Sequence, residues 1–183
     1  MQLSDAGELL DKTPACSALL HAWMEWANGT TVPIVENVRP ELIGVFLPRV
    51  TVFNLDIDGT MAYSLASGRQ RDLMNRDLRG SNLLDFTRPE DREERLRRTR
   101  PVNKYPCGML SQGDMVRKRG GVNTYTSLAL PVRVELGKTP SKAYLAIDDN
   151  AGVFVSDKDP IYIIPLAKTV IYIDLGFGAP PPI

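Results

Sequence analysis

The stretch of residues 63–86 constrains the fold of this chain most, because it joins a strand pattern to a series of short helical turns. It begins as a short strand, continues through the helical turns and the sequence NRDLRG at residues 75–80, and ends in an apolar cluster at Leu83, Leu84 and Phe86. A strand followed by short helical pieces and then by further strands is how a small domain builds one wall of a ligand chamber. The segment therefore predicts a sheet interrupted by a helical insert.

Length and composition are those of one globular domain. The chain has 183 residues, of which 43% are hydrophobic and 24% charged, which suffices for a single core and is short for two. Lys plus Arg and Asp plus Glu balance at 22 each, so neither nucleic acid nor an anionic membrane is expected as a partner.

The sequence also predicts a cytoplasmic location. The first residues lack a basic start and an apolar core, so no secretory signal is recognisable. The longest apolar stretch, residues 161–173, is broken by Pro165 and Lys168 and is too short to span a bilayer. Cys16 and Cys107 stand apart without a partner motif, which is typical of reduced thiols.

An amphipathic helix is predicted immediately after Thr13, which has the side chain of an N-cap and is followed by proline. Its apolar stripe recurs at helical spacing and contains both tryptophans of the chain: Leu19, Leu20, Trp23 and Trp26. Two tryptophans present too much apolar surface to remain in water. The stripe either covers a face of the sheet or meets a second copy, and we expect the second arrangement, a homodimer.

Strand patterns occupy much of the remaining chain. Residues 49–55 alternate with a period of two, and Asp58-Gly59 is a strong turn signal before an answering strand at residues 61–66. Further strands are predicted at residues 102–111, 121–134 and 142–148, with a last apolar element at 161–175. Strands grouped around a helical insert indicate an α+β fold with an antiparallel sheet.

A charged helix is predicted between these groups of strands. Thr87 and Glu90 have the spacing of a capping box, and the following residues place acids early and arginines late in the helix. Leu96 is its only apolar residue before Pro101, so the helix is expected to be largely solvated. The arginines are nearly balanced by acids and have no aromatic residues between them, which argues against a nucleic-acid surface.

Several short motifs follow one another along the chain: a Trp-bearing helix with Trp23 or Trp26, Gly29, Pro33, Leu47-Pro48, the strand at 63–68, Asp77-Leu78-Arg79-Gly80 and Leu130-Pro131. In their order and spacing they resemble the motifs of a family of short bacterial PAS-like proteins. The strand at 63–68 departs from the family pattern, with Ser64 in place of the usual arginine. The resemblance covers approximately residues 18–149.

The resemblance implies an α+β, PAS-like fold, with a five-stranded antiparallel sheet and helices on one face. The expected fold also includes the N-terminal amphipathic helix, which precedes the sheet, and a C-terminal extension, which follows it. The resemblance implies a division into an N-terminal helix and linker at 1–40, a PAS-like domain at 41–150 and an extension at 151–183 packed on the same domain. It further implies a non-catalytic sensory or regulatory module that binds a small apolar or amphipathic ligand, a signalling protein partner, or both.

Within such a fold the ligand chamber is expected between the sheet and residues 73–86. The candidate lining residues are apolar or aromatic: Tyr63, Leu65, Leu73, Met74, Leu78, Leu83, Leu84, Phe86, Met109, Tyr125 and Leu128. Each of them is equally suited to plain core packing. Tyr63 and Tyr125 are the best candidates for a polar contact, because tyrosine has a hydrogen-bonding tip on an apolar body.

The principal alternative is a Mg²⁺-dependent phosphatase of the haloacid-dehalogenase type. Asp56 and Asp58 in the sequence DIDGT match that family's nucleophile and acid/base, and Asp148-Asp149 offers an acidic pair for the metal. Lys138 or Lys142 would then bind phosphate. That family requires parallel strands, however, and the strand pattern around Asp56 predicts an antiparallel hairpin, so we expect a protein that is not an enzyme.

No cofactor or metal is predicted. His21 is the only histidine, so a multi-histidine metal site or a Ser-His-Asp triad is excluded. An axial haem ligand remains the one special role open to His21, against the simpler alternative of a surface imidazole. Neither cysteine has the sequence surroundings of a flavin-binding photosensor.

Overall fold

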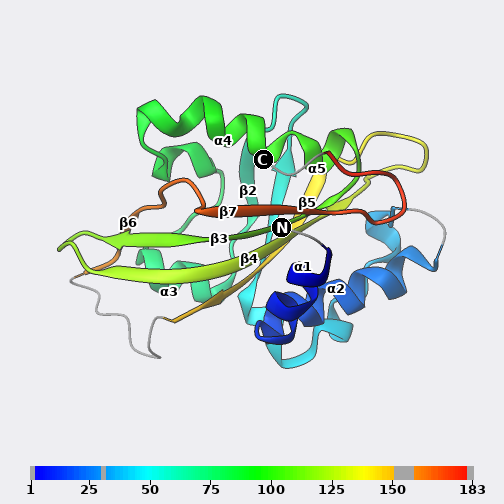
Figure 1. Ribbon diagram of the computed structural model, residues 1–183, viewed down its shortest axis with the longest axis horizontal. Helices are drawn as coiled ribbons and strands as arrows, with labels where there is room; N and C mark the ends of the chain where they lie inside the picture. The colour runs from blue at the N-terminus through cyan, green and yellow to red at the C-terminus, as the bar shows by residue number, and fades with distance from the viewer. Residues whose placement is uncertain (1–2, 30–31, 151–158, 181–183) are drawn as a thin grey trace.

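The computed structural model describes residues 3–29, 32–150 and 159–180, which form one antiparallel sheet with helices on both faces (Figure 1). The strand order is β2-β1-β5-β4-β3-β6, and β7 also pairs with β3. The strands have these bounds: β1 Val50–Leu55, β2 Met61–Leu65, β3 Gly108–Arg117, β4 Val122–Val132, β5 Lys142–Asp149, β6 Ile161–Ile163 and β7 Thr169–Ile173. The α+β fold with an antiparallel sheet that the sequence predicts is therefore confirmed.

Five of these strands, β2-β1-β5-β4-β3, are the sheet that the sequence predicts. The C-terminal extension enlarges it, because β6 pairs with the end of β3 near Val116 and β7 pairs with residues 108–112 of the same strand. One boundary was predicted wrongly. Pro101, which was expected to end a helix before a strand, instead begins a helical turn, and β3 starts only at Gly108 and continues to Arg117.

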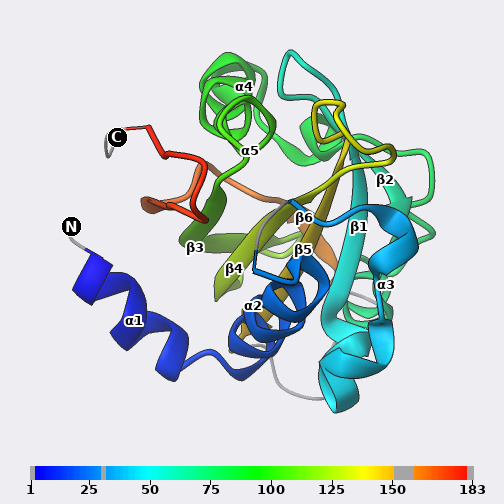
Figure 2. The same ribbon diagram turned by 90° about the vertical axis from the view of Figure 1, so that its right-hand side faces the viewer.

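The helices form two layers, one on each face of the sheet (Figure 2). Their bounds are α1 Leu3–Asp11, α2 Pro14–Ala27, α3 Gly68–Met74, α4 Arg92–Thr99 and α5 Pro101–Lys104, with 3-10 turns η1 Val35–Asn37, η2 Pro40–Arg49, η3 Leu83–Phe86 and η4 Pro89–Asp91. Helix α2 packs against β4 and β5, whereas α4 and α5 lie across the opposite face.

Alternation along β4 divides the core into two clusters. Leu128 and Leu130 lie in the cluster beneath α2, whereas Tyr125 and Ala129 lie in the cluster beneath α3 and η3. Successive side chains of a strand point to opposite faces, so one strand supplies both clusters. Because both faces are covered, β4 is buried along nearly its whole length.

The tryptophans of α2 are buried against the sheet of their own chain. Trp23 and Trp26 are each 3% exposed, and Leu19 is fully buried. The indole Nε1 of Trp23 donates a 2.7 Å hydrogen bond to the carbonyl of Pro131. Of the two arrangements considered for Leu19, Leu20, Trp23 and Trp26, the structure therefore shows the one in which the stripe covers the sheet, and the homodimer stays a prediction. The stripe covers the sheet, and only Leu20, which is half-buried, lies at its edge.

Two helix caps also differ from the sequence prediction. Thr13 does not cap α2; its hydroxyl donates to the carbonyl of Leu9, and the carboxylate of Asp148 instead accepts from the backbone N–H groups of Ala15 and Cys16. A capping box does occur, but it joins Asn82 and Asp85 in η3. Asp148 is 133 residues from Ala15 in sequence, so local capping rules cannot anticipate this partner.

The hairpin between β1 and β2 is present as predicted, and its glycine is tightly packed. Gly59 has φ of 92°, and its carbonyl accepts a 2.6 Å hydrogen bond from the hydroxyl of Thr99 in α4. A Cβ placed on Gly59 would lie 2.6 Å from the carbonyl oxygen of Leu96. The glycine in the sequence DIDGT is therefore required for the close approach of the hairpin to α4.

We predict that Gly59→Ala destabilises the protein much more than Gly137→Ala. Gly137 also has a positive φ, but a Cβ there meets nothing within 4 Å, so its substitution costs about 1 kcal/mol of backbone strain. Gly59→Ala adds a clash with rigid backbone, which we expect to cost at least about 2 kcal/mol more. Chemical denaturation of the two variants measures the difference, and equal losses of free energy of unfolding would contradict the packing role of Gly59.

Candidate functional site

A cavity of about 70 Å³ lies between the sheet and the layer that contains α3 and α4; we call it the chamber. Three parts of the chain enclose it: five strands of the sheet, the helical segments from α3 to α4, and the C-terminal extension. Its lining residues are Phe53, Met61, Gln70, Leu73, Met74, Leu83, Arg95, Arg98, Thr99, Met109, Ser111, Met115, Tyr125, Ser127, Leu145, Ile147, Ile161, Ile164, Leu166, Ala167 and Val170.

Five of the residues proposed from the sequence lie together in this lining: Leu73, Met74, Leu83, Met109 and Tyr125. They come from α3, η3, β3 and β4, which are distant in sequence and converge because the helical insert folds back over the sheet. The sequence therefore located the general position of the chamber, between the sheet and the segment that follows β2.

Three further candidates, Tyr63, Leu78 and Phe86, belong to the same buried cluster without lining the chamber. The ring of Tyr63 packs between Phe53 and Phe86, and its hydroxyl is buried with no hydrogen-bond partner in the described part of the chain. Tyr63, for which the sequence predicted a polar contact, therefore makes none among the described residues.

The remaining three candidates do not contribute to the chamber, which corrects the prediction. Leu65 is 53% exposed at the end of β2. Leu128 is buried in the cluster beneath α2, on the opposite face of the sheet from Tyr125. Leu84 is half-buried and is not part of the lining. The position of Leu128 follows directly from its odd separation from Tyr125 along the strand.

The polar part of the lining was not predicted from the sequence. Ser111 and Ser127 are paired across β3 and β4, with their hydroxyl oxygens 3.2 Å apart. Gln70 is buried, and its Oε1 accepts a 2.6 Å hydrogen bond from the hydroxyl of Thr51. Ser127 lies two residues from Tyr125 on one face of β4, so strand alternation was the signal that could have identified it.

Arg95 is the one charged residue of the lining that is buried. It lies on α4 and is 8% exposed, although the sequence predicted a solvated helix. Its Nη2 donates hydrogen bonds of 2.6 and 2.8 Å to the carbonyls of Ile164 and Pro165. Burial lowers the pKa of Arg95, because removal from water penalises the charged form.

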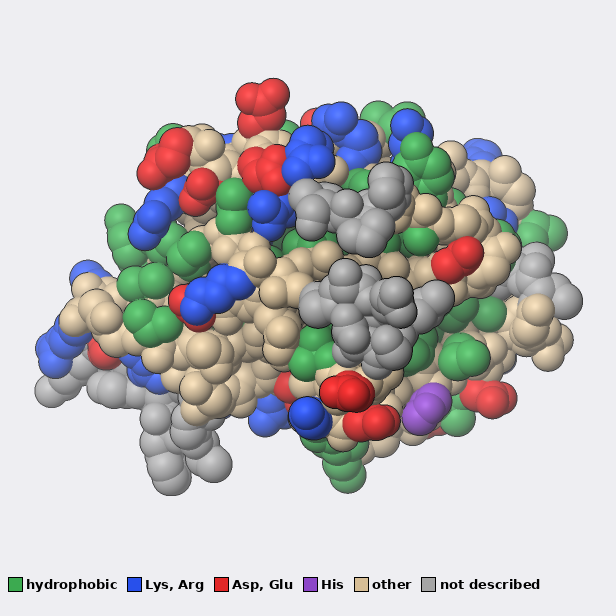
Figure 3. Space-filling model, in the orientation of Figure 1, with side chains coloured by type: hydrophobic (Ala, Val, Ile, Leu, Met, Phe, Trp, Pro, Cys, Tyr) green, Lys and Arg blue, Asp and Glu red, His purple; other side chains and the backbone are tan. Residues whose placement is uncertain are grey.

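The neighbouring Arg98 also lines the chamber but has a charged partner. Its Nε lies 2.6 Å from Glu94, and its Nη1 donates to the carbonyl of Ala167. Hydrogen bonds from Arg97 and Arg98 lower the pKa of Glu94 to about 2, so this ion pair persists to acidic pH. Together Arg95 and Arg98 fasten the extension at residues 164–167 to α4. In the space-filling view, acidic and basic side chains intermingle above this region (Figure 3).

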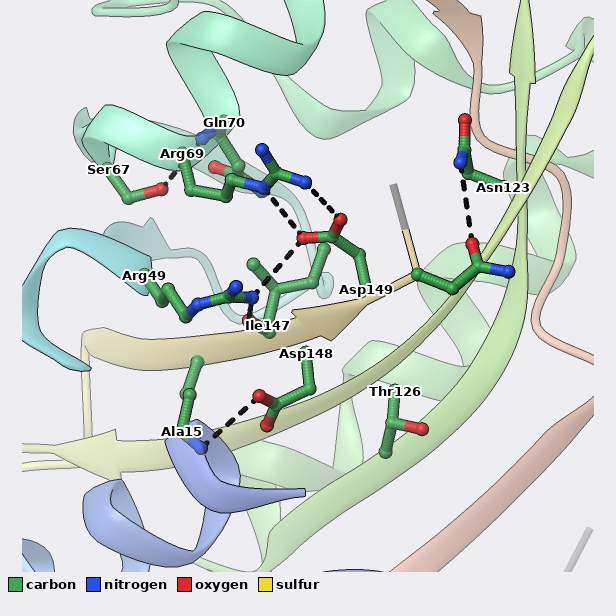
Figure 4. A network of polar contacts seen from close by, with 12 residues as sticks. Ala15, Arg49, Ser67, Arg69, Gln70, Asn123, Thr126, Ile147, Asp148 and Asp149 are labelled. Atoms are coloured by element: carbon green, nitrogen blue, oxygen red, sulfur yellow. Dashed lines mark hydrogen bonds and ion pairs between the residues drawn. The ribbon is translucent and has the colours of Figure 1, made fainter. Parts of the chain in front are cut away.

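Two adjacent carboxylates at the end of β5 fix the helices on both faces of the sheet (Figure 4). Asp148 caps α2 on one face. On the other face, Asp149 accepts hydrogen bonds from Nε and Nη2 of Arg69 at 2.9 and 2.5 Å, and Arg49 approaches to 3.4 Å. The side chain of Asp149 is fully buried. This carboxylate pair therefore has a structural role in the positioning of α2 and α3.

The geometry of Asp56 and Asp58 does not match the phosphatase alternative. Strand β1, which precedes them, is antiparallel to both of its neighbours, β2 and β5. Leu55, the residue before Asp56, donates its backbone N–H to the carbonyl of Ser141, which precedes β5, whereas Asp148 and Asp149 lie at the other end of that strand. Lys142 donates to the side chain of Asn54, and Lys138 pairs with Glu135. The residues proposed for that chemistry are not brought together.

No cluster of three or more potential metal ligands occurs among the described residues. His21, the purple residue in Figure 3, is exposed on α2. Both cysteines are buried. Burial raises the pKa of the Cys107 thiol to about 12 and, with the nearby charge of Asp148, also raises that of Cys16, so neither thiol is activated as a nucleophile. Within the described ranges, no helix is long and apolar enough to cross a membrane.

Comparison with known proteins identifies the family. A family model described as "PAS domain" matches residues 11–143, which is more than half of the chain, and the chain therefore belongs to the PAS domain family. The match includes the tryptophan-bearing helix α2. No curated protein matches the sequence significantly.

Solved structures include a PAS domain similar to this chain. It is the PAS domain of a protein from Colwellia psychrerythraea, with 13% sequence identity and a TM-score of 0.42. The similarity covers 55% of this chain and 85% of that chain.

We predict that Asp149→Ala lowers the free energy of unfolding by about 3 kcal/mol, because it leaves Arg69 without its buried carboxylate partner. Glu135→Ala is the matched control. It removes an ion pair with Lys138 whose side chains are 61% and 70% exposed, so its loss should stay below about 1 kcal/mol. Equilibrium denaturation in urea measures both. A loss in Asp149→Ala no larger than in the control would contradict the structural role of the pair.

Proposed function

We propose that this PAS domain is a non-catalytic sensory or regulatory module whose signal is a small molecule bound in the chamber. The observation that carries the proposal is the chamber itself, an apolar cavity with a few convergent polar groups at the junction of three parts of the chain. Binding sites for small molecules have this character. The antiparallel surroundings of Asp56, which do not suit phosphoryl transfer, support the non-catalytic part of the proposal.

The C-terminal extension is the part of the wall best suited to transmit the signal. It supplies Ile161, Ile164, Leu166, Ala167 and Val170 to the lining, and its backbone is attached to α4 chiefly by arginine side chains. A ligand that competes for these arginines, or pushes on the apolar residues, changes how tightly residues 164–167 are held. A signalling protein that contacts the extension would detect this change.

The size of the chamber limits the ligand. About 70 Å³ exceeds the space that one water requires, but it is smaller than the engineered apolar cavity of roughly 150 Å³ that binds benzene. Four of its lining residues are methionines, Met61, Met74, Met109 and Met115, whose unbranched side chains adapt readily to a guest. The expected ligands are therefore small molecules of a few heavy atoms, admitted with rearrangement of these methionines.

Methionine methyl NMR tests this proposal directly. Four of the six methionines in the sequence line the chamber, whereas Met24 is 57% exposed on α2. Addition of a library of small fragments should shift the four chamber methyl signals and leave that of Met24 unchanged. Native mass spectrometry of freshly purified protein should in addition detect any ligand retained from the cell.

A filled chamber provides the matched control for this experiment. Leu73→Phe adds bulk to the lining, whereas Leu84→Phe adds the same bulk at a half-buried position outside it. We expect fragment binding to be lost in the first variant and kept in the second. Fragments that shift only Met24, or that bind equally to both variants, would contradict binding in the chamber.

A further inference from the structure

Arg95 is a buried positive charge without an acidic partner. No described carboxylate lies within 4.0 Å of its guanidinium, in contrast to Arg98 one turn later on the same helix. The groups to which it donates hydrogen bonds are two neutral backbone carbonyls, and the charge of Asp91, four residues earlier, acts on it only from beyond ion-pair distance. A buried charge is costly unless it is both paired and hydrogen-bonded, and Arg95 has no carboxylate in direct contact.

The hydrogen bonds of Arg95 are also incomplete. Both carbonyl acceptors, those of Ile164 and Pro165, are bound by Nη2 alone. The Nε–H is buried and has no partner in the described part of the chain. An unmade hydrogen bond from a buried charged group costs more than one from a neutral group. The hydrogen bonds that hold the extension account for Nη2 of the guanidinium, whereas they give no role to its Nε–H.

An anion bound in the chamber would satisfy both deficits. A carboxylate accepts from a guanidinium in a planar, charge-assisted arrangement, and it neutralises the charge at the same time. The other polar groups of the lining, Gln70, Ser111 and Ser127, are neutral and hydrogen-bonding. A doubly charged, strongly hydrated anion such as phosphate is disfavoured, because the chamber offers a single unpaired cation among apolar side chains.

We propose that the ligand of the chamber is a small monocarboxylate whose carboxylate binds Arg95 and whose short apolar body lies among the methionines. This inference rests on the proposed function, since it specifies the chemistry of the same chamber. It assigns to Arg95 the selection of anionic over neutral guests. The carboxylate would bind close to the carbonyls of residues 164 and 165, so occupancy is coupled to the attachment of the extension.

Pairs of acids and their primary amides test the assignment. Acetate, propionate and butyrate have nearly the same shape as acetamide, propionamide and butyramide, but only the acids are charged at about pH 7. Titrations followed by the methionine methyl signals give dissociation constants for each pair. We expect the acids to bind roughly tenfold or more tightly than the amides, as a charge-assisted hydrogen bond in a buried site provides.

Two variants locate the source of this preference. In Arg95→Met the acids should lose their advantage, so that acid and amide bind about equally. Arg92→Met removes an exposed arginine from the same helix and should keep the preference of the wild type. If Arg95→Met fails to fold, the ratio of acid to amide affinities in the wild type alone tests whether the chamber prefers a carboxylate.

The outcomes separate the two proposals. Amides that bind as tightly as the acids to the wild type would overturn the carboxylate assignment and leave the chamber as a site for neutral molecules. A preference for acids that persists in folded Arg95→Met would overturn the role of Arg95. If no acid, amide or other fragment shifts the chamber methyl signals, both the ligand class and the proposed function are wrong.

Discussion

Adjacent carboxylates on the central strand β5 hold the two layers of this domain to its sheet. Because successive residues of a strand face opposite sides, Asp148 reaches the N-terminus of α2 and Asp149 reaches Arg69 in α3. The first contact adds to the packing of the tryptophan helix on one face. The second fixes the start of the helical insert that closes the chamber on the other face. Loss of Asp149 would free the helix that carries Leu73 and Met74.

The parts of the fold with local patterns were predictable. Helix α2, the β1–β2 hairpin and strand β5 all follow from periodicity and turn residues, and the PAS-like arrangement follows from the order of the motifs. Strand β3 was misplaced because residues 102–107 carry no signal that distinguishes a strand from a helical turn after proline. The sequence did not predict that β3 continues through Gln112 and Asp114, because polar residues in this segment are typical of a loop.

The candidate site was only partly predictable, for a different reason. Apolar lining residues such as Leu73 and Met109 are visible from the sequence, since they belong to a core in any case. The burial of Arg95 depends on the extension, which folds back over α4 from about 70 residues further along the chain. A charged residue among other charged residues is predicted to be exposed to solvent unless this tertiary contact is known. The two possible positions of the tryptophan stripe were likewise decided only by packing.

The central claim is that an apolar chamber lies under the sheet at the junction with α3, α4 and the extension. Crystals of the protein exposed to xenon under pressure test this claim most directly, because xenon enters dry apolar cavities and is located by its anomalous scattering. We expect a xenon site in van der Waals contact with Leu73 and Met115, which line the chamber. The absence of xenon there, with sites only on the surface or beneath α2, would contradict it.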